Sequence, residues 1–254
     1  MNSSGVSTDN AGGSTYSAGK KTADVAIGNL ILAYLDPAER EGLWPFLEPY
    51  PLAWHAVLHE PGESIEFAYF PNSGVVSQIV SVKDGKSVEV GIVGREGFIG
   101  APLAEGLDKS PHRSLVQVPG DAYRIRATVL RDLLPAAPKL RVLMTRYALI
   151  QSMQVAQTAA CNRLHALDQR LARWLLMTQD RVDAQTLNMT HERLASLLGT
   201  DRPSVSDAAG GFQKSGIIAY KRGTLKILSR RKLKEAACEC YDIMQEYYSQ
   251  LGLE

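Results

Sequence analysis

Hydrophobic residues at the start of the chain recur at helical spacing. Between positions 24 and 47 they fall on one face of a helix, at Ile27, Leu30, Ile31 and Tyr34. Asp36 and Pro37 predict the start of a second helix, because aspartate caps helices and proline fits their first turn. The chain therefore opens with short helices.

From Pro51 to Arg126 the pattern becomes that of β-strands. Short β-branched and aromatic runs alternate with turn residues, and the predicted strands are 53–59, 65–70, 75–82, 87–93, 114–118 and 122–125. Asp84-Gly85 is a typical hairpin turn. Strands at this spacing predict a small antiparallel barrel or sandwich.

After Thr128 the period is helical again. Residues 139–161 lack glycine and proline, and one apolar stripe runs along them through Leu140, Leu143, Tyr147 and Ile150. The next position of the stripe, Gln154, is polar. So narrow a stripe favours pairing with the same helix of a second subunit. The alternative is that the helix packs on its own barrel.

The C-terminal third predicts two short helices joined by a tight turn. A preceding helix, 164–181, has an apolar face formed by Leu167, Leu171, Trp174 and Leu175. Thr190 can cap a helix ending at Leu198, and Asp201 can cap a helix over 202–214 with Pro203 in its first turn. Its inward positions are Val205, Ala209 and Phe212.

Two strands, 217–220 and 224–228, follow and turn at Lys221-Arg222-Gly223. Two helices, a tight turn and a hairpin form a winged helix-turn-helix, whose second helix enters the major groove of DNA. Gly210-Gly211 inside that helix is unexpected. It indicates either a close approach of the first helix or a break.

Charge supports the same prediction. The chain carries a net charge of +1, but residues 202–234 hold nine basic side chains and one acid, Asp207, which leaves +8. Arg202 is the candidate for reading guanine, with a phosphate contact or an internal salt bridge as the alternative. The other candidate DNA-binding residues are Thr190, Asp201, Pro203, Ser204, Ser206, Lys221 and Arg222, the last two on the wing.

Other function classes find no support in the sequence. No catalytic motif or phosphate loop is present, so we expect no enzyme, cofactor or metal. Cys161, Cys238 and Cys240 are expected to be structural or incidental thiols, since two cysteines two apart on a helix point in different directions. The alternative is that the three cysteines bind a metal or sense redox state. Positions 1–23 read as a disordered tail without a signal peptide, and no apolar run could span a membrane. A cytoplasmic protein is expected.

Three segments together resemble the Crp/Fnr superfamily, the cyclic-AMP receptor protein and its relatives. They are Tyr69-Phe70-Pro71 through Gly74-Val75-Val76-Ser77, Glu89-Val90-Gly91 to Arg95-Glu96-Gly97-Phe98-Ile99-Gly100, and 194–206. The resemblance covers about 27–233. It implies a homodimer, a cyclic-nucleotide-binding-like β-roll sensor, a palindromic DNA site, and regulation through RNA polymerase.

The resemblance also implies roles for individual residues, and the sequence departs from the family's pattern at several positions. Arg202 matches the family's guanine-reading arginine and Ser204 its phosphate-contacting hydroxyl, but Pro203 and Asp207 stand where the family often has Glu and Arg. In the sensor, Arg113-Ser114 resembles the pair that holds a cyclic phosphate. The family's ribose-binding Gly-Glu is here Gly100-Ala101, so cyclic AMP is not the expected effector. The oxygen-sensing branch of the family holds an iron–sulfur centre with an N-terminal cluster of cysteines. That mechanism is excluded here, because no cysteine precedes Cys161.

The predicted fold is α+β, with an antiparallel β-roll, a long dimerisation helix and a winged helix-turn-helix domain. The expected divisions are a tail at 1–23, a sensor at 24–135, the dimerisation helix at 136–161, the DNA-binding domain at 162–234 and a helical extension at 235–254. We expect a homodimeric, sequence-specific regulator of transcription that binds double-stranded DNA under an unidentified signal, such as a small-molecule effector. The alternative is a ligand-binding sensor whose DNA-binding domain is vestigial.

Overall fold

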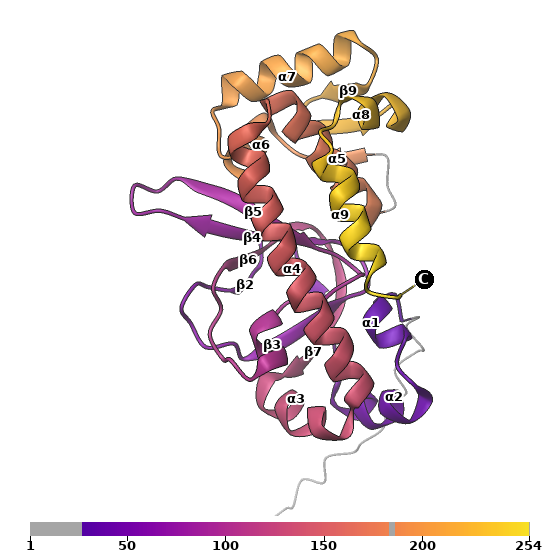
Figure 1. Ribbon diagram of the computed structural model, residues 1–254. Helices are drawn as coiled ribbons and strands as arrows, with labels where there is room; N and C mark the ends of the chain where they lie inside the picture. The colour runs from indigo at the N-terminus through magenta and orange to yellow at the C-terminus, as the bar shows by residue number, and fades with distance from the viewer. Residues whose placement is uncertain (1–26, 183–185, 254) are drawn as a thin grey trace, which may run out of the picture.

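Two antiparallel sheets pack against each other in the first half of the chain (Figure 1). The computed structural model describes residues 27–182 and 186–253, so the predicted tail at 1–23 lies outside the described residues. One sheet has the order β1-β7-β3 and the other β2-β6-β4-β5. The strands are β1 (Glu48–Leu52), β2 (Val57–His59), β3 (Phe67–Pro71), β4 (Val75–Ser81), β5 (Ser87–Val93), β6 (Arg113–Val118) and β7 (Gly120–Arg126).

The predicted antiparallel sheets are confirmed, with one error at the first strand. The predicted strand 53–59 is wrong in its first half, because a turn over Trp54 and His55 separates β1 from β2. Strand β1 contains Pro49 and Pro51, which the sequence pattern does not favour in a strand. They are tolerated because, among the described strands, β1 pairs only with β7 and so forms an edge of its sheet, where a missing N–H costs little.

Short helices cover one end of the β-roll. They are α1 (Leu30–Ala33), α2 (Pro37–Leu43) and the 3-10 turn η1 (Trp44–Phe46), and Asp36 and Pro37 begin α2 as predicted. The buried side chain of Asn29 accepts from Leu32 N and donates to Pro71 O and Gly97 O. One amide thus both caps α1 and fastens it to the sheets.

The long helix α4 (Pro138–Leu164) crosses the front of the molecule (Figure 1). It follows the 3-10 turns η2 (Ala101–Glu105) and η3 (Leu134–Ala136) and the helix α3 (Ala127–Leu133). Its predicted stripe is buried in the core of its own β-roll, so the use of that stripe as a seam between subunits is wrong. Contact is close at Gly97, where an added Cβ would overlap the ring of Tyr147.

Gln154 continues the buried face of α4 instead of ending it. Its Oε1 accepts from Ile92 N at 3.2 Å and its Nε2 donates to Tyr248 Oη at 2.8 Å. The polar position in the stripe is therefore a buried, hydrogen-bonded link between a strand and the C-terminal segment.

A second hydrophobic core holds the C-terminal unit together. It is built from α5 (Leu167–Val182), α6 (His191–Leu198), α7 (Arg202–Lys214), α8 (Arg230–Ala236) and a sheet of order β8-β10-β9. The strands are β8 (Thr186–Asn188), β9 (Ile218–Lys221) and β10 (Thr224–Ile227). The helices and the hairpin match the prediction, whereas β8 was missed because three residues carry too little pattern.

The last helix, α9 (Cys240–Ser249), lies beside α4 and joins the two cores (Figure 1). Met244 is buried in the C-terminal core, and Leu251, just past the helix, is buried in the core of the β-roll. None of the described helices is long and apolar enough to cross a membrane.

Candidate DNA-binding interface

Both helices of the helix-turn-helix begin at the predicted caps. Thr190 Oγ1 accepts from Arg193 N at 3.2 Å, and Asp201 Oδ1 accepts from Ser204 N at 2.8 Å. Gly199 ends α6 with a φ of 61°, a left-handed conformation that glycine adopts without strain. These local bonds set where the second helix, α7, begins.

The first turn of α7 is exposed at the end of the molecule. Arg202 and Pro203 are exposed, and no described acid lies within ion-pair distance of the Arg202 guanidinium. The internal salt bridge considered for Arg202 is therefore absent from the described residues. The guanidinium is free to reach a base edge or a phosphate.

Ser204 and Ser206 already have partners within the chain. Ser204 Oγ donates to Asp201 Oδ2 at 2.8 Å. The hydrogen bond from the backbone N–H of Ser204, and then the one from its hydroxyl, lower the pKa of Asp201. Ser206 Oγ donates to Arg202 O at 3.0 Å and lies 2.8 Å from His191 Nδ1. Both hydroxyls therefore stabilise the first turn of α7 through hydrogen bonds within the chain.

His191 lies within the candidate interface, and the sequence did not single it out. Its ring stacks on Tyr220 with centroids 4.2 Å apart, and Tyr220 Oη donates to Met189 O at 3.1 Å. Burial, and then the charge of Arg202, lower the pKa of His191. A neutral imidazole thus connects α6, α7 and β9, and no local pattern marks such a contact.

The wing turns through two residues in the left-handed region. Arg222 has a φ of 51° and Gly223 a φ of 81°, between the paired residues Lys221 and Thr224. A two-residue hairpin of this kind suits glycine, whereas arginine adopts it at some cost. The turn leaves the Lys221 and Arg222 side chains exposed at the tip.

The structure reduces the local positive charge that the sequence indicates. Arg230 pairs with Asp180 at 2.5 Å, Arg231 with Glu235 at 2.5 Å and Lys234 with Asp242 at 2.9 Å. The three acids lie outside 202–234, so counting charge along the chain missed them. Within residues 202–234, six basic side chains pair with no described acid: Arg202, Lys214, Lys221, Arg222, Lys226 and Lys232.

Neither explanation of Gly210-Gly211 holds. Helix α7 continues unbroken to Lys214, and a Cβ added at either glycine would meet nothing within 4 Å. No neighbour among the described residues requires a glycine there, and nothing in the structure explains the pair.

Buried polar contacts fasten this unit to the β-roll. Arg181 Nε on α5 donates to Glu96 Oε1 at 2.8 Å, and Trp174 Nε1 donates to Glu89 Oε1 at 2.8 Å. Arg193 Nη2 on α6 donates to Gln117 Oε1 at 2.6 Å. The orientation of α7 relative to the sheets therefore depends on side chains from both units.

A cavity of about 300 Å³ lies between the β-roll and α4. Of the predicted effector residues, Gly100, Ala101 and Ser114 line it, whereas Arg113 instead forms an ion pair with Glu60 at 3.2 Å. Other lining residues that the sequence did not single out are His59, Gln78, Glu105, Gln151 and Ser152. The side chains of α4 that close the cavity could not be predicted, because they come from a distant segment.

The cysteines also differ from the expectation. Cys238 lies in the bend before α9 and Cys240 is the first residue of that helix, so the two do not diverge from one helix. They converge with Cys161 and His165.

Residues 169–236 match the family described as the Crp-like helix-turn-helix domain. No curated protein matches the chain significantly.

Solved structures share the fold at low sequence identity. The structure of FixK2 from Bradyrhizobium japonicum is similar with a TM-score of 0.65 and 13% identity, over 76% of this chain and 98% of that one. The c-di-GMP-responsive global regulator CLP from Xanthomonas campestris has a TM-score of 0.62 and 18% identity, over 76% and 100%. A CRP-family transcriptional regulator from Thermus thermophilus has a TM-score of 0.61 and 20% identity, over 75% and 96%.

Proposed function

We propose that this chain, a Crp/Fnr-type transcription regulator with a Crp-like helix-turn-helix domain, binds a specific palindromic promoter site as a homodimer. The observation that carries the proposal is the exposed first turn of α7, where Arg202 pairs with no described acid. A helix presented in this way enters the major groove with its N-terminal residues nearest the bases.

The surrounding charges support DNA as the partner. Lys221 and Arg222 on the wing are exposed, and neither pairs with a described acid. Phosphate contacts by such side chains position a protein on the duplex, while the base contact of Arg202 specifies the sequence. Asp207, exposed on the same helix, would repel phosphates and so influence the preferred site.

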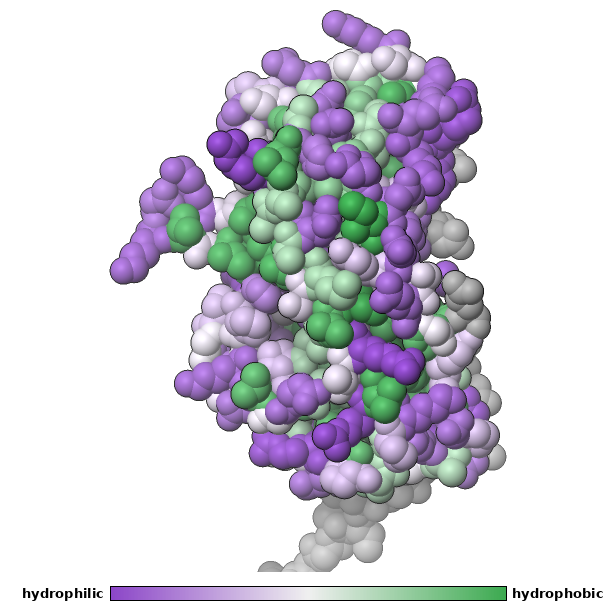
Figure 2. All heavy atoms as spheres, viewed as in Figure 1, coloured by the Kyte–Doolittle hydropathy of each residue, from purple (hydrophilic) through white to green (hydrophobic). Residues whose placement is uncertain are grey.

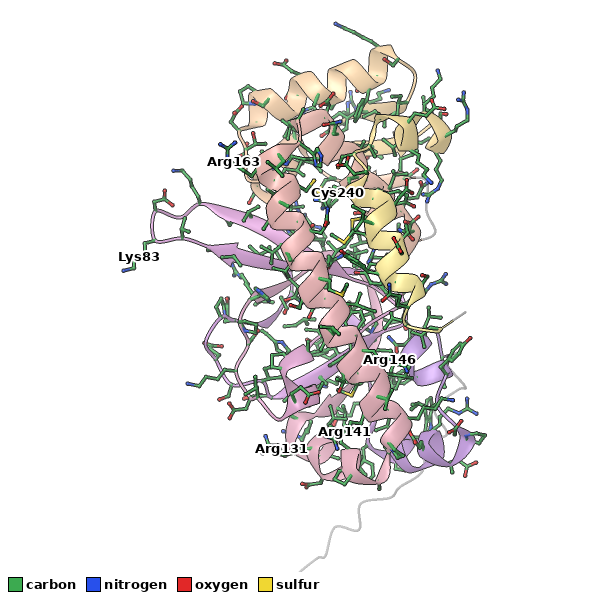
Figure 3. The ribbon with its side chains drawn as sticks, in the orientation of Figure 1. Lys83, Arg131, Arg141, Arg146, Arg163 and Cys240 are labelled. Atoms are coloured by element: carbon green, nitrogen blue, oxygen red, sulfur yellow. The ribbon has the colours of Figure 1, made fainter. Side chains whose placement is uncertain are left out.

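The homodimer would use the outer face of α4. One set of positions recurs there every seven residues, at Val142, Leu149 and Ala156, and a second set follows each of them by three residues, at Thr145, Ser152 and Ala159. The side chains of Val142 and Leu149 are 48% and 64% exposed. Figure 2 shows hydrophobic residues along the path of α4 on this side of the molecule. Figure 3 shows the charged residues Arg141 and Arg146 on the same helix. A seven-residue repeat of apolar and small residues suits helix pairing.

The signal would enter through the cavity between the β-roll and α4. A ligand there would touch Gln151 and Ser152 of the helix as well as Ser114 of the sheet. It could therefore change the pairing of α4 and with it the spacing of the two α7 helices. Cyclic AMP is not the expected effector, and RNA polymerase is the partner implied by the family.

The test is a DNA-binding assay with the full-length protein on sites selected from random sequence. Arg202→Ala should weaken binding to the selected site about 5- to 150-fold for each half-site, since a bidentate arginine–guanine contact contributes roughly 1–3 kcal/mol. It should also relax the preference at one base pair of each half-site. Arg231→Ala, which removes an equal charge already paired with Glu235, is the matched control and should change affinity less than about 3-fold.

Two results would contradict the proposal. Selection that yields no salt-sensitive, sequence-dependent site would favour the alternative of a sensor with a vestigial DNA-binding domain. Equal losses for Arg202→Ala and Arg231→Ala would show that Arg202 acts only through its charge.

A further inference from the structure

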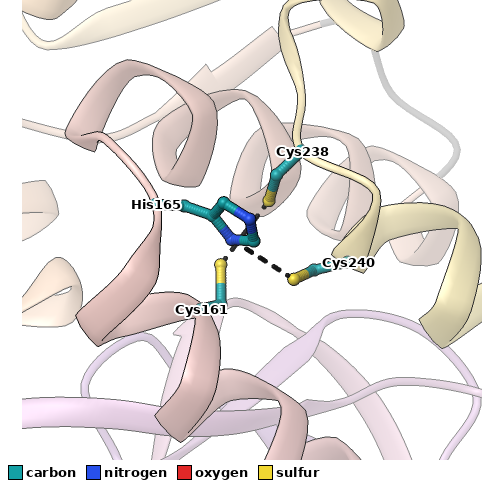
Figure 4. A group of neighbouring side chains, drawn as sticks. All are labelled: Cys161, His165, Cys238 and Cys240. Atoms are coloured by element: carbon teal, nitrogen blue, oxygen red, sulfur yellow. Dashed lines mark hydrogen bonds between the residues drawn. The ribbon is translucent and has the colours of Figure 1, made fainter.

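Four potential metal ligands meet where α4 ends and α9 begins (Figure 4). Cys161 lies in the last turn of α4, and His165 directly follows that helix. Cys238 lies in the connection between α8 and α9, and Cys240 is the first residue of α9. Their donor atoms all lie within 4.8 Å of one another, and the three thiols are buried. Every cysteine of the chain is in this cluster.

The spacing fits a single tetrahedral ion. Cys161 Sγ lies 3.5 Å from Cys238 Sγ, and Cys240 Sγ lies 3.5 Å from His165 Nδ1. With zinc bonds of about 2.3 Å to sulfur and about 2.0 Å to nitrogen, tetrahedral donors stand roughly 3.5–3.8 Å apart. An iron–sulfur cluster places several irons and sulfides between its ligands, so it needs a wider cage.

The surroundings hold the ligands in the required orientation. His165 Nε2 lies 3.2 Å from Glu239 Oε1, so the carboxylate can keep a proton on Nε2 and leave the Nδ1 lone pair directed at the thiols. Metal-binding histidines typically have such a carboxylate partner. Gln157 Nε2 donates to Cys240 Sγ at 3.1 Å and so orients one sulfur.

A disulfide accounts for less of this arrangement. A bond between Cys161 and Cys238 would use two of the four groups. It would leave Cys240, His165 and the Glu239 contact without a role. Three cysteines and one histidine are a complete ligand set for structural zinc.

We propose that Cys161, His165, Cys238 and Cys240 bind one zinc ion in a structural Cys₃His site. The ligands flank the helix-turn-helix domain at residues 169–236, two before it and two after it. The ion would thus tie both ends of that domain together at the end of α4. Its effect on DNA binding rests on the proposed function, whereas metal binding itself does not.

The test measures zinc in full-length protein that carries no histidine tag and is purified under reducing conditions. We expect one zinc ion per chain, and cobalt in its place should give the intense visible absorption of a tetrahedral thiolate site. Serine at any of the three cysteines, and His165→Gln, should reduce bound zinc to background. His55→Gln, a histidine outside the cluster, is the matched control and should retain the ion.

A milder variant keeps the test decisive if a ligand variant does not fold. Glu239→Gln leaves all four ligands and should weaken zinc affinity about 10- to 100-fold, because it loosens the orientation of His165. Circular dichroism reports whether each variant is folded.

The proposal is overturned if folded wild-type protein, dialysed against zinc, holds no more metal than folded Cys161→Ser. It is also overturned if a Cys161–Cys238 disulfide persists in reducing buffer. These results are separate from the proposed function, because metal content is measured without DNA and the DNA assay needs no knowledge of the metal.

Discussion

Glu89 shows at the scale of one residue how the two units are coupled. Its carboxylate is buried on β5, accepts from Trp174 Nε1 of α5 and from Ser77 Oγ of β4, and has a pKa raised to about 7. Burial is the main cause, and the two hydrogen bonds and the charges of Arg173 and Arg181 oppose it. A proton on this acid therefore stabilises the contact between sheet and helix.

The pH dependence follows from the sign of that shift. The folded pKa is above the ordinary value of 4.5, so the stability that Glu89 contributes is complete below that pH and is lost as the pH rises towards 7. Glu89→Gln should therefore raise the unfolding free energy at pH 8 relative to wild type, by about 3 kcal/mol, and much less at pH 5.

Chemical denaturation at the two pH values measures the effect of Glu89→Gln. Glu235→Gln, an exposed acid paired with Arg231, is the control and should show no such pH-dependent difference. Equal changes at pH 5 and pH 8 for Glu89→Gln would contradict a role for its ionisation.

For a single element, the effect of the glycine pair in α7 on stability can be tested by substitution. A Cβ at Gly211 would meet none of the described residues within 4 Å, so Gly211→Ala should only reduce the backbone freedom of the unfolded chain. We expect the protein to gain about 0.5–1 kcal/mol in unfolding free energy, measured by chemical denaturation.

Gly199 provides the contrasting substitution. Its φ is 61° and an added Cβ would lie 3.1 Å from Val88 Cγ2, so Gly199→Ala should destabilise the protein. If Gly211→Ala destabilises it as well, α7 must have a neighbour that the isolated chain does not show.

At the level of the assembled protein, the proposed homodimer depends on the outer face of α4. Leu149 is 64% exposed at the centre of the seven-residue repeat. Leu149→Glu should convert a dimer into a monomer in light scattering, because two carboxylates would face each other across the seam. Val82→Glu, a 58% exposed apolar residue near the tip of the β4–β5 hairpin, should leave the mass unchanged. A dimer that survives Leu149→Glu would place the interface elsewhere.

Elements that depend on neighbouring residues could be predicted from the sequence. The bounds of α6 and α7 match the prediction, because Thr190, Asp201 and Gly199 act on backbone within a few positions. The wing and strand β5 follow from equally local patterns of turns and alternation. The Crp-like helix-turn-helix was recognisable for the same reason.

The partner of each buried face is known from the folded chain and not from the sequence pattern. The period of α4 shows that one face is buried, but a period carries no information about the partner, which is the β-roll. Likewise, Asp180 and Asp242 lie outside the basic segment along the sequence, yet they form ion pairs with two of its side chains. Cys161 contacts Cys238 although the helix-turn-helix domain separates the two cysteines along the sequence. Such contacts depend on how the chain returns on itself, which local preferences along the sequence do not encode.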